Sequence, residues 1–170
     1  MIKKWMFATA VVLMFSACEE GASGNEAKVT KQEVVKKGEV LTTDYFDVTV
    51  NDLRITSKIE SGNPYLDDVI ASEGQCFLII NTTFKNTNTE SRMIFEGSLE
   101  VKTPEGKSYM FDKTESILGV DGYGALLEQI NPLTSFTTNI VFQMPKDIKG
   151  SIYYHPGRSD GETIDLGKIN

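Results

Sequence analysis

Gln75–Asn86 (QCFLIINTTFKN) constrains the fold of this chain more than any other segment. Every second residue falls on one almost entirely apolar face, which consists of Cys76, Leu78, Ile80, Thr82 and Phe84. The opposite face is apolar only at Phe77 and Ile79 and becomes polar from Asn81 onward. A period of two is that of a β-strand, so we expect a strand that begins buried on both faces and ends at the surface. Because burial of a large apolar side chain contributes about 1.5–3 kcal/mol, a polar residue at Ile80 should unfold much of the domain.

Seven further ranges show the same alternation or a short apolar run, and turn residues separate them. They are 45–57, 93–101, 107–111, 125–130, 134–144, 150–155 and 163–169. Eight or nine short strands with no long helical period predict an all-β chain folded as a β-sandwich. In 45–57 the apolar phase changes at Asn51 and Asp52, which predicts either a bulge or a strand that crosses between sheets. Residues 112–123 have no clear period, and we expect an irregular loop there with at most one helical turn.

The first residues resemble the signal peptide of a bacterial lipoprotein. Lys3 and Lys4 precede an apolar run over 5–15, and its 11 residues are too few for a transmembrane helix, which needs about 20. The Ser-Ala-Cys that ends at Cys18 is similar to the lipobox, in which the cysteine takes a diacylglycerol and becomes the mature N-terminus. Phe15 stands where the lipobox usually has Leu, and a cleaved secretory signal beside an unmodified cysteine is the alternative.

These features divide the chain into three predicted parts. They are a lipoprotein signal peptide over 1–17, a lipidated N-terminus and flexible linker over 18–40, and one domain over 41–170. Within the linker we expect 27–37 to be disordered or weakly helical. Two or more acyl chains on Cys18 would hold the protein stably on a lipid bilayer, which predicts a lipid-anchored protein of the bacterial cell envelope. Glu19 and Glu20 resemble a sorting signal for the cell surface, or they simply begin the linker.

The balance of charge argues against nucleic acid as a partner. The chain has 24 Asp and Glu against 17 Lys and Arg, which gives a formal net charge of −7. Proteins that bind nucleic acid neutralise phosphates with clustered Lys and Arg. The same balance argues against a domain that docks flat on anionic lipid.

Three motifs between residues 78 and 146 carry a resemblance to a known family. They are an apolar strand running into an Asn-Thr turn over 78–88, a hairpin over 99–109 in which Gly106 precedes an aromatic residue, and a late strand with Pro at each end over 130–132 and 141–146. Together they resemble an immunoglobulin-like family of secreted bacterial antigens and lipoproteins, catalogued largely as a domain of unknown function (DUF4352-like). Leu133 departs from this pattern, because the family usually has Gly directly after the first proline. The resemblance implies an immunoglobulin-like β-sandwich and an envelope location, and it supplies no catalytic residues.

The residues that usually carry catalysis or bind metals are too few to predict an enzyme. His155 is the only histidine, and no G-x-S-x-G motif places a serine nucleophile for it. Cys76 is the only cysteine besides Cys18, and it lies on the apolar face, where a buried thiol is expected. One histidine and one thiol cannot complete a tetrahedral zinc site. We therefore expect no catalytic residues, no metal and no cofactor.

Two acidic loops provide the candidate binding residues. Tyr65, Asp67 and Asp68 lie in the first loop, and Asp121 and Tyr123 lie in the second. Exposed loop aromatics can anchor a partner, although both tyrosines could instead cap one end of the sandwich. The loop carboxylates, together with the oxygens of Asn63 and Asp112, leave calcium as an alternative ligand, although the spacing of an EF-hand is absent.

The leading functional hypothesis is a non-enzymatic module that binds a protein or a glycan through its loops while Cys18 holds it on the bilayer. The first alternative is an envelope hydrolase that depends on His155. The second is an accessory subunit whose sheet edge pairs with a strand of its partner.

Overall fold

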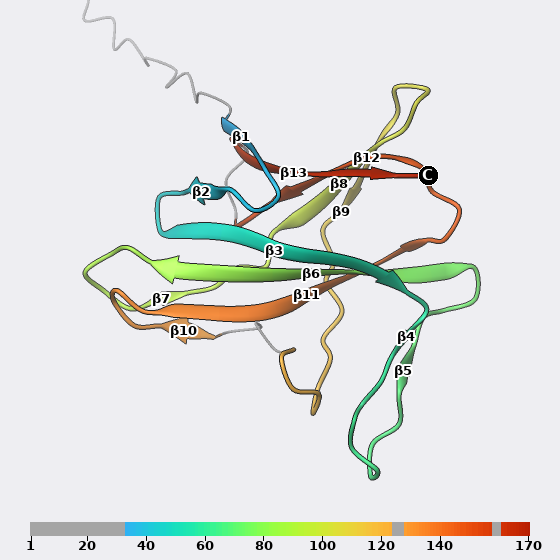
Figure 1. Ribbon diagram of the computed structural model, residues 1–170, viewed down its shortest axis with the longest axis horizontal. Helices are drawn as coiled ribbons and strands as arrows, with labels where there is room; N and C mark the ends of the chain where they lie inside the picture. The colour runs from blue at the N-terminus through green and yellow to red at the C-terminus, as the bar shows by residue number, and fades with distance from the viewer. Residues whose placement is uncertain (1–32, 124–127, 158–160) are drawn as a thin grey trace, which may run out of the picture.

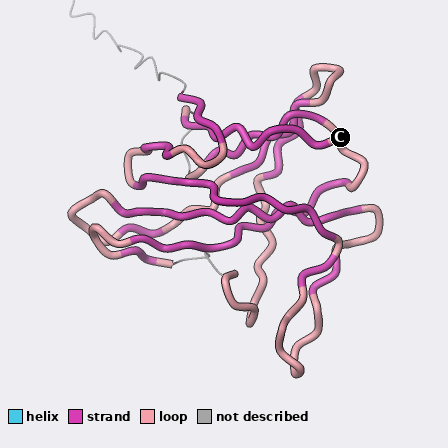
Figure 2. Tube along the Cα trace, viewed as in Figure 1, coloured by secondary structure: helices cyan, strands magenta, loops and turns pink. Residues whose placement is uncertain are grey.

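The computed structural model describes residues 33–123, 128–157 and 161–170, and these residues form strands and loops with no helix (Figures 1 and 2). The segment predicted to be the central strand is β6 (Gln75–Asn86). It pairs antiparallel with β3 (Phe46–Thr56) on one side and β11 (Ser135–Pro145) on the other. Leu78 and Ile80 are fully buried, whereas Lys85 near the end of β6 is exposed. The predicted strand is confirmed, and its outer face becomes exposed at Lys85 as expected, but Asn86 at its end is fully buried and not at the surface.

Two sheets pack face to face, and their strand order is that of an immunoglobulin-like sandwich (Figure 1). The first sheet has the order β11-β6-β3-β2, with β2 at Val40–Thr42. The second has the order β1-β13-β12-β8-β9 and comprises β1 (Glu33–Lys36), β8 (Ser98–Lys102), β9 (Ser108–Phe111), β12 (Gly150–His155) and β13 (Glu162–Ile169). In the first sheet, β3, β6 and β11 correspond to strands A, B and E of an immunoglobulin domain. In the second sheet, β8, β12 and β13 correspond to strands C, F and G. The predicted fold class is confirmed.

Inward-facing side chains of the two sheets form the main core. The second sheet contributes Leu99, Val101, Ile152, Tyr154 and Ile164, all buried against β3, β6 and β11. The rings of Phe46 and Phe84 meet edge to face with their centroids 6.0 Å apart. Tyr154 is fully buried, and its hydroxyl donates to the carbonyl oxygen of Glu96 at 2.7 Å. This bond satisfies the one polar atom of a large core side chain, as burial requires.

The predicted phase change in the segment now seen as β3 is a β-bulge. The pairing of β3 with β6 shifts register between Val50 and Asp52, and β3 stays in one sheet along its whole length. The extra residue returns Leu53 to the core side, opposite Ile80. Of the two alternatives that the sequence left open, the bulge is therefore correct and the crossing between sheets is wrong.

A second, smaller apolar cluster lies on the outer face of the first sheet. It consists of Ile59, Phe77, Ile79, Ile117 and Val141, all buried. Residues 112–123 cover this face through single β-bridges from Thr114 to Phe142 and from Tyr123 to Asn139, without a helical turn. A hairpin of β4 (Lys58–Ile59) and β5 (Val69–Ile70) also contributes to it, where the sequence predicted only a long loop.

The sequence predicts a broken strand over 93–101 with Gly97 in the middle, and the structure confirms this break. Before the glycine lies β7 (Arg92–Met93), which pairs with β10 (Gln129–Ile130). After it lies β8, which pairs with β12 in the second sheet. Gly97 has φ +80°, and a Cβ at this position would lie 2.1 Å from the carbonyl oxygen of His155. Glycine is therefore required here by both its conformation and the close approach of β12.

The N-terminal predictions are corrected in part. Residues 33–36, assigned by sequence to a disordered or weakly helical linker, form β1 and pair in parallel with β13. Val35 packs against the main core, which explains why this segment is a strand despite its charged neighbours. The signal peptide, Cys18 and the two glutamates after it lie outside the described residues. No helix within the described ranges is long and apolar enough to cross a membrane.

Leu133 is the one non-glycine residue with positive φ among those described, at +60°. It follows Pro132 in a turn closed by a hydrogen bond from the Thr134 amide to the Asn131 carbonyl oxygen at 3.2 Å. Proline at the second position and positive φ at the third define a type II turn, which favours glycine. This is the position where the sequence departs from the family pattern.

Candidate functional site

The two loops that hold the predicted binding residues touch each other. A Cβ on Gly119 would meet the side chain of Leu66 at 2.7 Å, which places the loop between β4 and β5 against residues 112–123. Tyr65 is 92% exposed and Leu118 is 82% exposed. Exposed large apolar side chains on adjoining loops are typical of an interaction surface.

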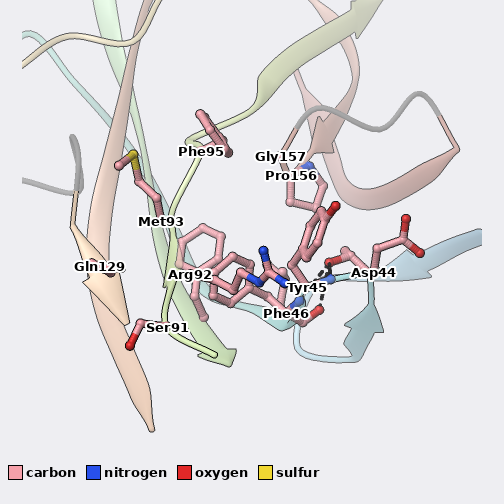
Figure 3. A pocket seen from close by; sticks show the side chains of 13 residues that line it. Asp44, Tyr45, Phe46, Ser91, Arg92, Met93, Phe95, Gln129, Pro156 and Gly157 are labelled. Atoms are coloured by element: carbon pink, nitrogen blue, oxygen red, sulfur yellow. Dashed lines mark hydrogen bonds between the residues drawn. The ribbon is translucent and has the colours of Figure 1, made fainter. Parts of the chain in front are cut away.

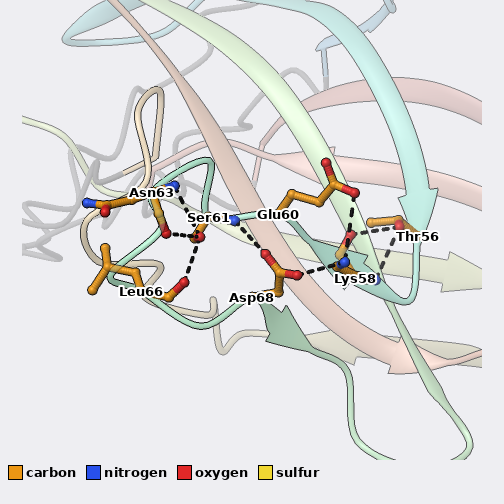
Figure 4. Close-up of polar contacts among 7 residues, drawn as sticks. All are labelled: Thr56, Lys58, Glu60, Ser61, Asn63, Leu66 and Asp68. Atoms are coloured by element: carbon orange, nitrogen blue, oxygen red, sulfur yellow. Dashed lines mark hydrogen bonds and ion pairs between the residues drawn. The ribbon is translucent and has the colours of Figure 1, made fainter.

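The two aspartates of the first loop have different surroundings, and Figure 4 shows those of Asp68. Asp68 accepts hydrogen bonds from Lys58 Nζ at 2.7 Å and from the Ser61 amide at 2.9 Å. Both hydrogen bonds lower the pKa of Asp68, and the bond from Lys58 has the larger effect. Asp68 therefore holds the base of the hairpin together, whereas the neighbouring Asp67 is exposed.

Tyr123 and Asp121 differ in the same way in the second loop. The Tyr123 ring packs against the second apolar cluster, and its hydroxyl accepts a hydrogen bond from Arg54. Asp121 is exposed. Tyr123 therefore packs on the outer face of the first sheet and does not project from the loop as an exposed anchor. The described part of the chain contains no group of three His, Cys, Asp or Glu side chains that could hold a metal ion.

His155 lies on the outer face of the second sheet. Its Nε2 is 3.3 Å from Glu100 Oε2, and its Nδ1 is 3.1 Å from Thr163 Oγ1. A hydroxyl, an imidazole and a carboxylate are thus in line, as in a catalytic triad. However, Thr163 is only 3% exposed, so a substrate could not reach its hydroxyl.

A cavity of about 660 Å³ opens at the other end of β6, away from the two predicted loops (Figure 3). Most of its walls are apolar and include Phe46, Phe84, Met93 and Phe95. Its volume lies within the range of about 300–1,000 Å³ that is usual for small-molecule sites. The sequence analysis did not identify this site.

A short turn and a neighbouring asparagine position one wall of the cavity. Thr43 Oγ1 accepts from the Phe46 amide at 3.1 Å and donates to the Phe46 carbonyl oxygen at 3.0 Å, which fixes the turn between β2 and β3. Asn88 Nδ2 donates to the Tyr45 carbonyl oxygen at 2.8 Å. Asn88 follows β6, so the turn that presents Tyr45 is tied to the central strand.

Arg92 is the basic residue of the cavity. Its guanidinium lies over the Tyr45 ring, 5.1 Å from the centroid. One terminal nitrogen is 3.2 Å from Glu90 Oε2, on a side chain that is mostly exposed. Its Nε is buried and has no hydrogen-bond partner. Figure 3 shows Arg92 beside Tyr45, with Met93 and Phe95 on one side of the cavity and Asp44 on the other.

Comparisons with known proteins concern fold and family. Residues 35–164 match the family model described as a domain of unknown function (DUF4352). An uncharacterized beta-sandwich protein from Clostridium difficile 630 has a TM-score of 0.58 and 16% identity, over 83% of this chain and 96% of that one. A conserved hypothetical protein from Bacillus anthracis has a TM-score of 0.52 and 16% identity, over 76% of this chain and 94% of that one.

A third solved structure, a "putative lipoprotein" from Bacillus subtilis, has a TM-score of 0.49 and 17% identity, over 79% of this chain and 38% of that one. No curated protein matches the chain. The likeness to the first two structures supports the β-sandwich, and none of the three assigns a ligand or a reaction.

Proposed function

This chain belongs to the family of the domain of unknown function DUF4352, which its residues 35–164 match, and we propose that it is a non-enzymatic binding module of the bacterial cell envelope. The basic start, the short apolar run and Cys18 support attachment to a lipid bilayer through an acylated cysteine. The intact mass of the mature protein extracted from membranes tests this part. Acylation predicts a mass that begins at Cys18 with the lipid added, and a free Cys18 thiol would contradict it.

The observation that carries the binding role is the cavity at the β2–β3 turn. Its walls are mainly apolar, a few polar groups line it, and strands of the sandwich hold it in place. This combination is typical of a preformed ligand site. The occupant that these walls favour has an apolar body of small-molecule size.

Substitution of a wall residue tests the cavity. Met93→Lys should place a charge in the apolar wall and weaken binding of a neutral probe such as 4-phenylbutan-1-ol by about tenfold or more. Met110→Lys is a matched control, because Met93 and Met110 are both about half exposed and Met110 lies on β9 outside the cavity. Calorimetric titration of the probe into each protein measures the difference. Equal affinity of the two variants would refute this assignment.

The loop end supports a second candidate, a protein or glycan partner. The exposure of Tyr65 and Leu118 on two touching loops is the observation that favours it. Capture of envelope components on the immobilised protein should be lost in Tyr65→Ala and retained in Tyr109→Ala, which alters an exposed tyrosine on β9. Capture that does not depend on Tyr65 would count against this surface.

The two remaining alternatives have less support. A hydrolase that uses His155 would need an accessible nucleophile, and the hydroxyl in contact with its ring is buried. His155→Ala with unchanged activity on a broad substrate panel would exclude it. β9 is an edge strand of the second sheet on which Tyr109 and Met110 are exposed, and it is the edge we would test for pairing with a partner strand. Hydrogen exchange would then show new protection of the β9 amides when the partner is added.

A further inference from the structure

We propose that the cavity binds a small apolar carboxylic acid and that Arg92 binds its carboxylate. This inference rests on the proposed role of the cavity as a ligand site and adds the chemical class of the ligand. The residues that carry it are Arg92, Tyr45 and the apolar side chains on the other wall.

Arg92 lines the cavity and leaves one of its donors without a partner. Its Nε is buried without an acceptor, whereas nearly all buried polar atoms of proteins have a partner. Because the Nε is itself buried, an acceptor that the ligand brings would reach Arg92 at its terminal nitrogens, on a side chain that is 39% exposed. A bound oxygen would therefore add an acceptor to a guanidinium whose hydrogen bonding within the protein is incomplete.

The form of the guanidinium favours a carboxylate over a neutral acceptor. Guanidinium is planar and presents its N–H groups in a fixed fork that matches two carboxylate oxygens. The cation–π contact with the Tyr45 ring restrains the guanidinium, so less side-chain freedom is lost on binding. Glu90 contacts one terminal nitrogen, and its exposure to water weakens its competition for the remaining donors.

The rest of the cavity limits the size and charge of the acid. Met93 and Phe95 offer an apolar wall, and a volume of about 660 Å³ suits a small molecule. The chain has a formal net charge of −7, so a ligand with several negative charges would be repelled. Asp44 also lines the cavity and disfavours a second anionic group. A single carboxylate on an apolar body fits these conditions.

A matched pair of probes tests the proposal. We would titrate 4-phenylbutyrate and 4-phenylbutan-1-ol into the full-length chain in phospholipid nanodiscs, with empty nanodiscs subtracted. The acid should bind about tenfold more tightly than the alcohol, as a charge-assisted bond predicts. Arg92→Gln should lower acid affinity about tenfold and leave alcohol affinity within about twofold, which also verifies that the cavity is intact. Asp44→Asn should strengthen binding of the acid.

Two further variants separate the contact from general charge and from misfolding. Arg54→Gln removes a positive charge outside the cavity and should leave both affinities unchanged. Arg92→Lys keeps the charge without the planar fork and should give an acid affinity between those of the wild type and Arg92→Gln.

Each contrary outcome has a distinct meaning. Equal affinity for the acid and the alcohol would overturn the assignment of a carboxylate but leave the cavity as a ligand site. An Arg92→Gln variant that weakens both probes equally would also overturn it, because Arg92 would then only shape the wall. Failure of both probes to bind would overturn this inference and the proposed ligand site together.

Discussion

Replacement of Leu133 by glycine should stabilise the protein. Leu133 has φ +60°, a conformation that costs an ordinary L-residue about 1–2 kcal/mol. Its side chain is 78% exposed, so little packing is lost when it is removed. Glycine offsets part of the gain through its greater freedom in the unfolded chain, by about 0.5–1 kcal/mol. The net expectation for Leu133→Gly is a gain of about 0.5–1 kcal/mol.

Two companion variants isolate the backbone cause. Leu133→Asn should also stabilise, because asparagine tolerates the left-handed region without the flexibility of glycine. Leu133→Ala removes the same exposed side chain but keeps a Cβ, so it should bring no gain. The backbone amide of Leu133, which donates to the Asn86 carbonyl oxygen at 3.0 Å, is present in all three variants.

Urea denaturation of the four proteins measures the effect. The midpoint should rise in the glycine and asparagine variants with an unchanged slope, and the melting temperature should rise by about 2–5 °C. If the glycine variant is no more stable than the alanine variant, the reasoning from φ is refuted.

Three further predictions concern the close approach at Gly97, the base of the β4–β5 hairpin and the buried thiol. Gly97→Ala should destabilise far more than Gly106→Ala in chemical denaturation, because both have φ +80° but only Gly97 has a carbonyl oxygen 2.1 Å from the added Cβ. Hydrogen bonds lower the pKa of Asp68 in the folded protein, so its contribution to the free energy of unfolding is complete above its unfolded pKa of about 3.9 and is lost as pH falls through its folded pKa. The wild type and Asp68→Asn should therefore converge in stability in acid. A stability difference that does not change with pH would refute this. Burial raises the pKa of the Cys76 thiol, so iodoacetamide should modify it slowly in the native protein and rapidly in urea, and equal rates would refute its burial.

Long strands could be predicted from the sequence because their apolar residues repeat every second position over many residues. β6 has the predicted bounds, and β11 and β12 agree with their predicted ranges to within one residue. β4 and β5 have two residues each, too few to show any period. Their position depends on Ile59, which packs against Phe77 in a cluster that only the folded chain brings together.

The cavity could not be predicted for a related reason. Tyr45, Arg92 and Phe95 come from a turn, a two-residue strand and the segment after it, and no local pattern marks them. The Arg92 guanidinium lies over the Tyr45 ring although 46 intervening residues separate the two in the chain. The sequence did identify exposed aromatic residues in loops, and of these Tyr65 is exposed while Tyr123 packs inward.

The parallel pairing of β1 with β13 has a mechanical consequence. β1 is the first described strand after the N-terminal segment, and four residue pairs, from Glu33 with Glu162 to Lys36 with Asp165, join it to the sheet edge. Any tension that a tethered N-terminus transmits to the domain reaches this short strand before any other element. A pull along its axis would load these hydrogen bonds together in shear, whereas a pull away from the edge would break them one after another. Tension on the N-terminus would thus reach β2 and β3 only after β1 has separated from β13.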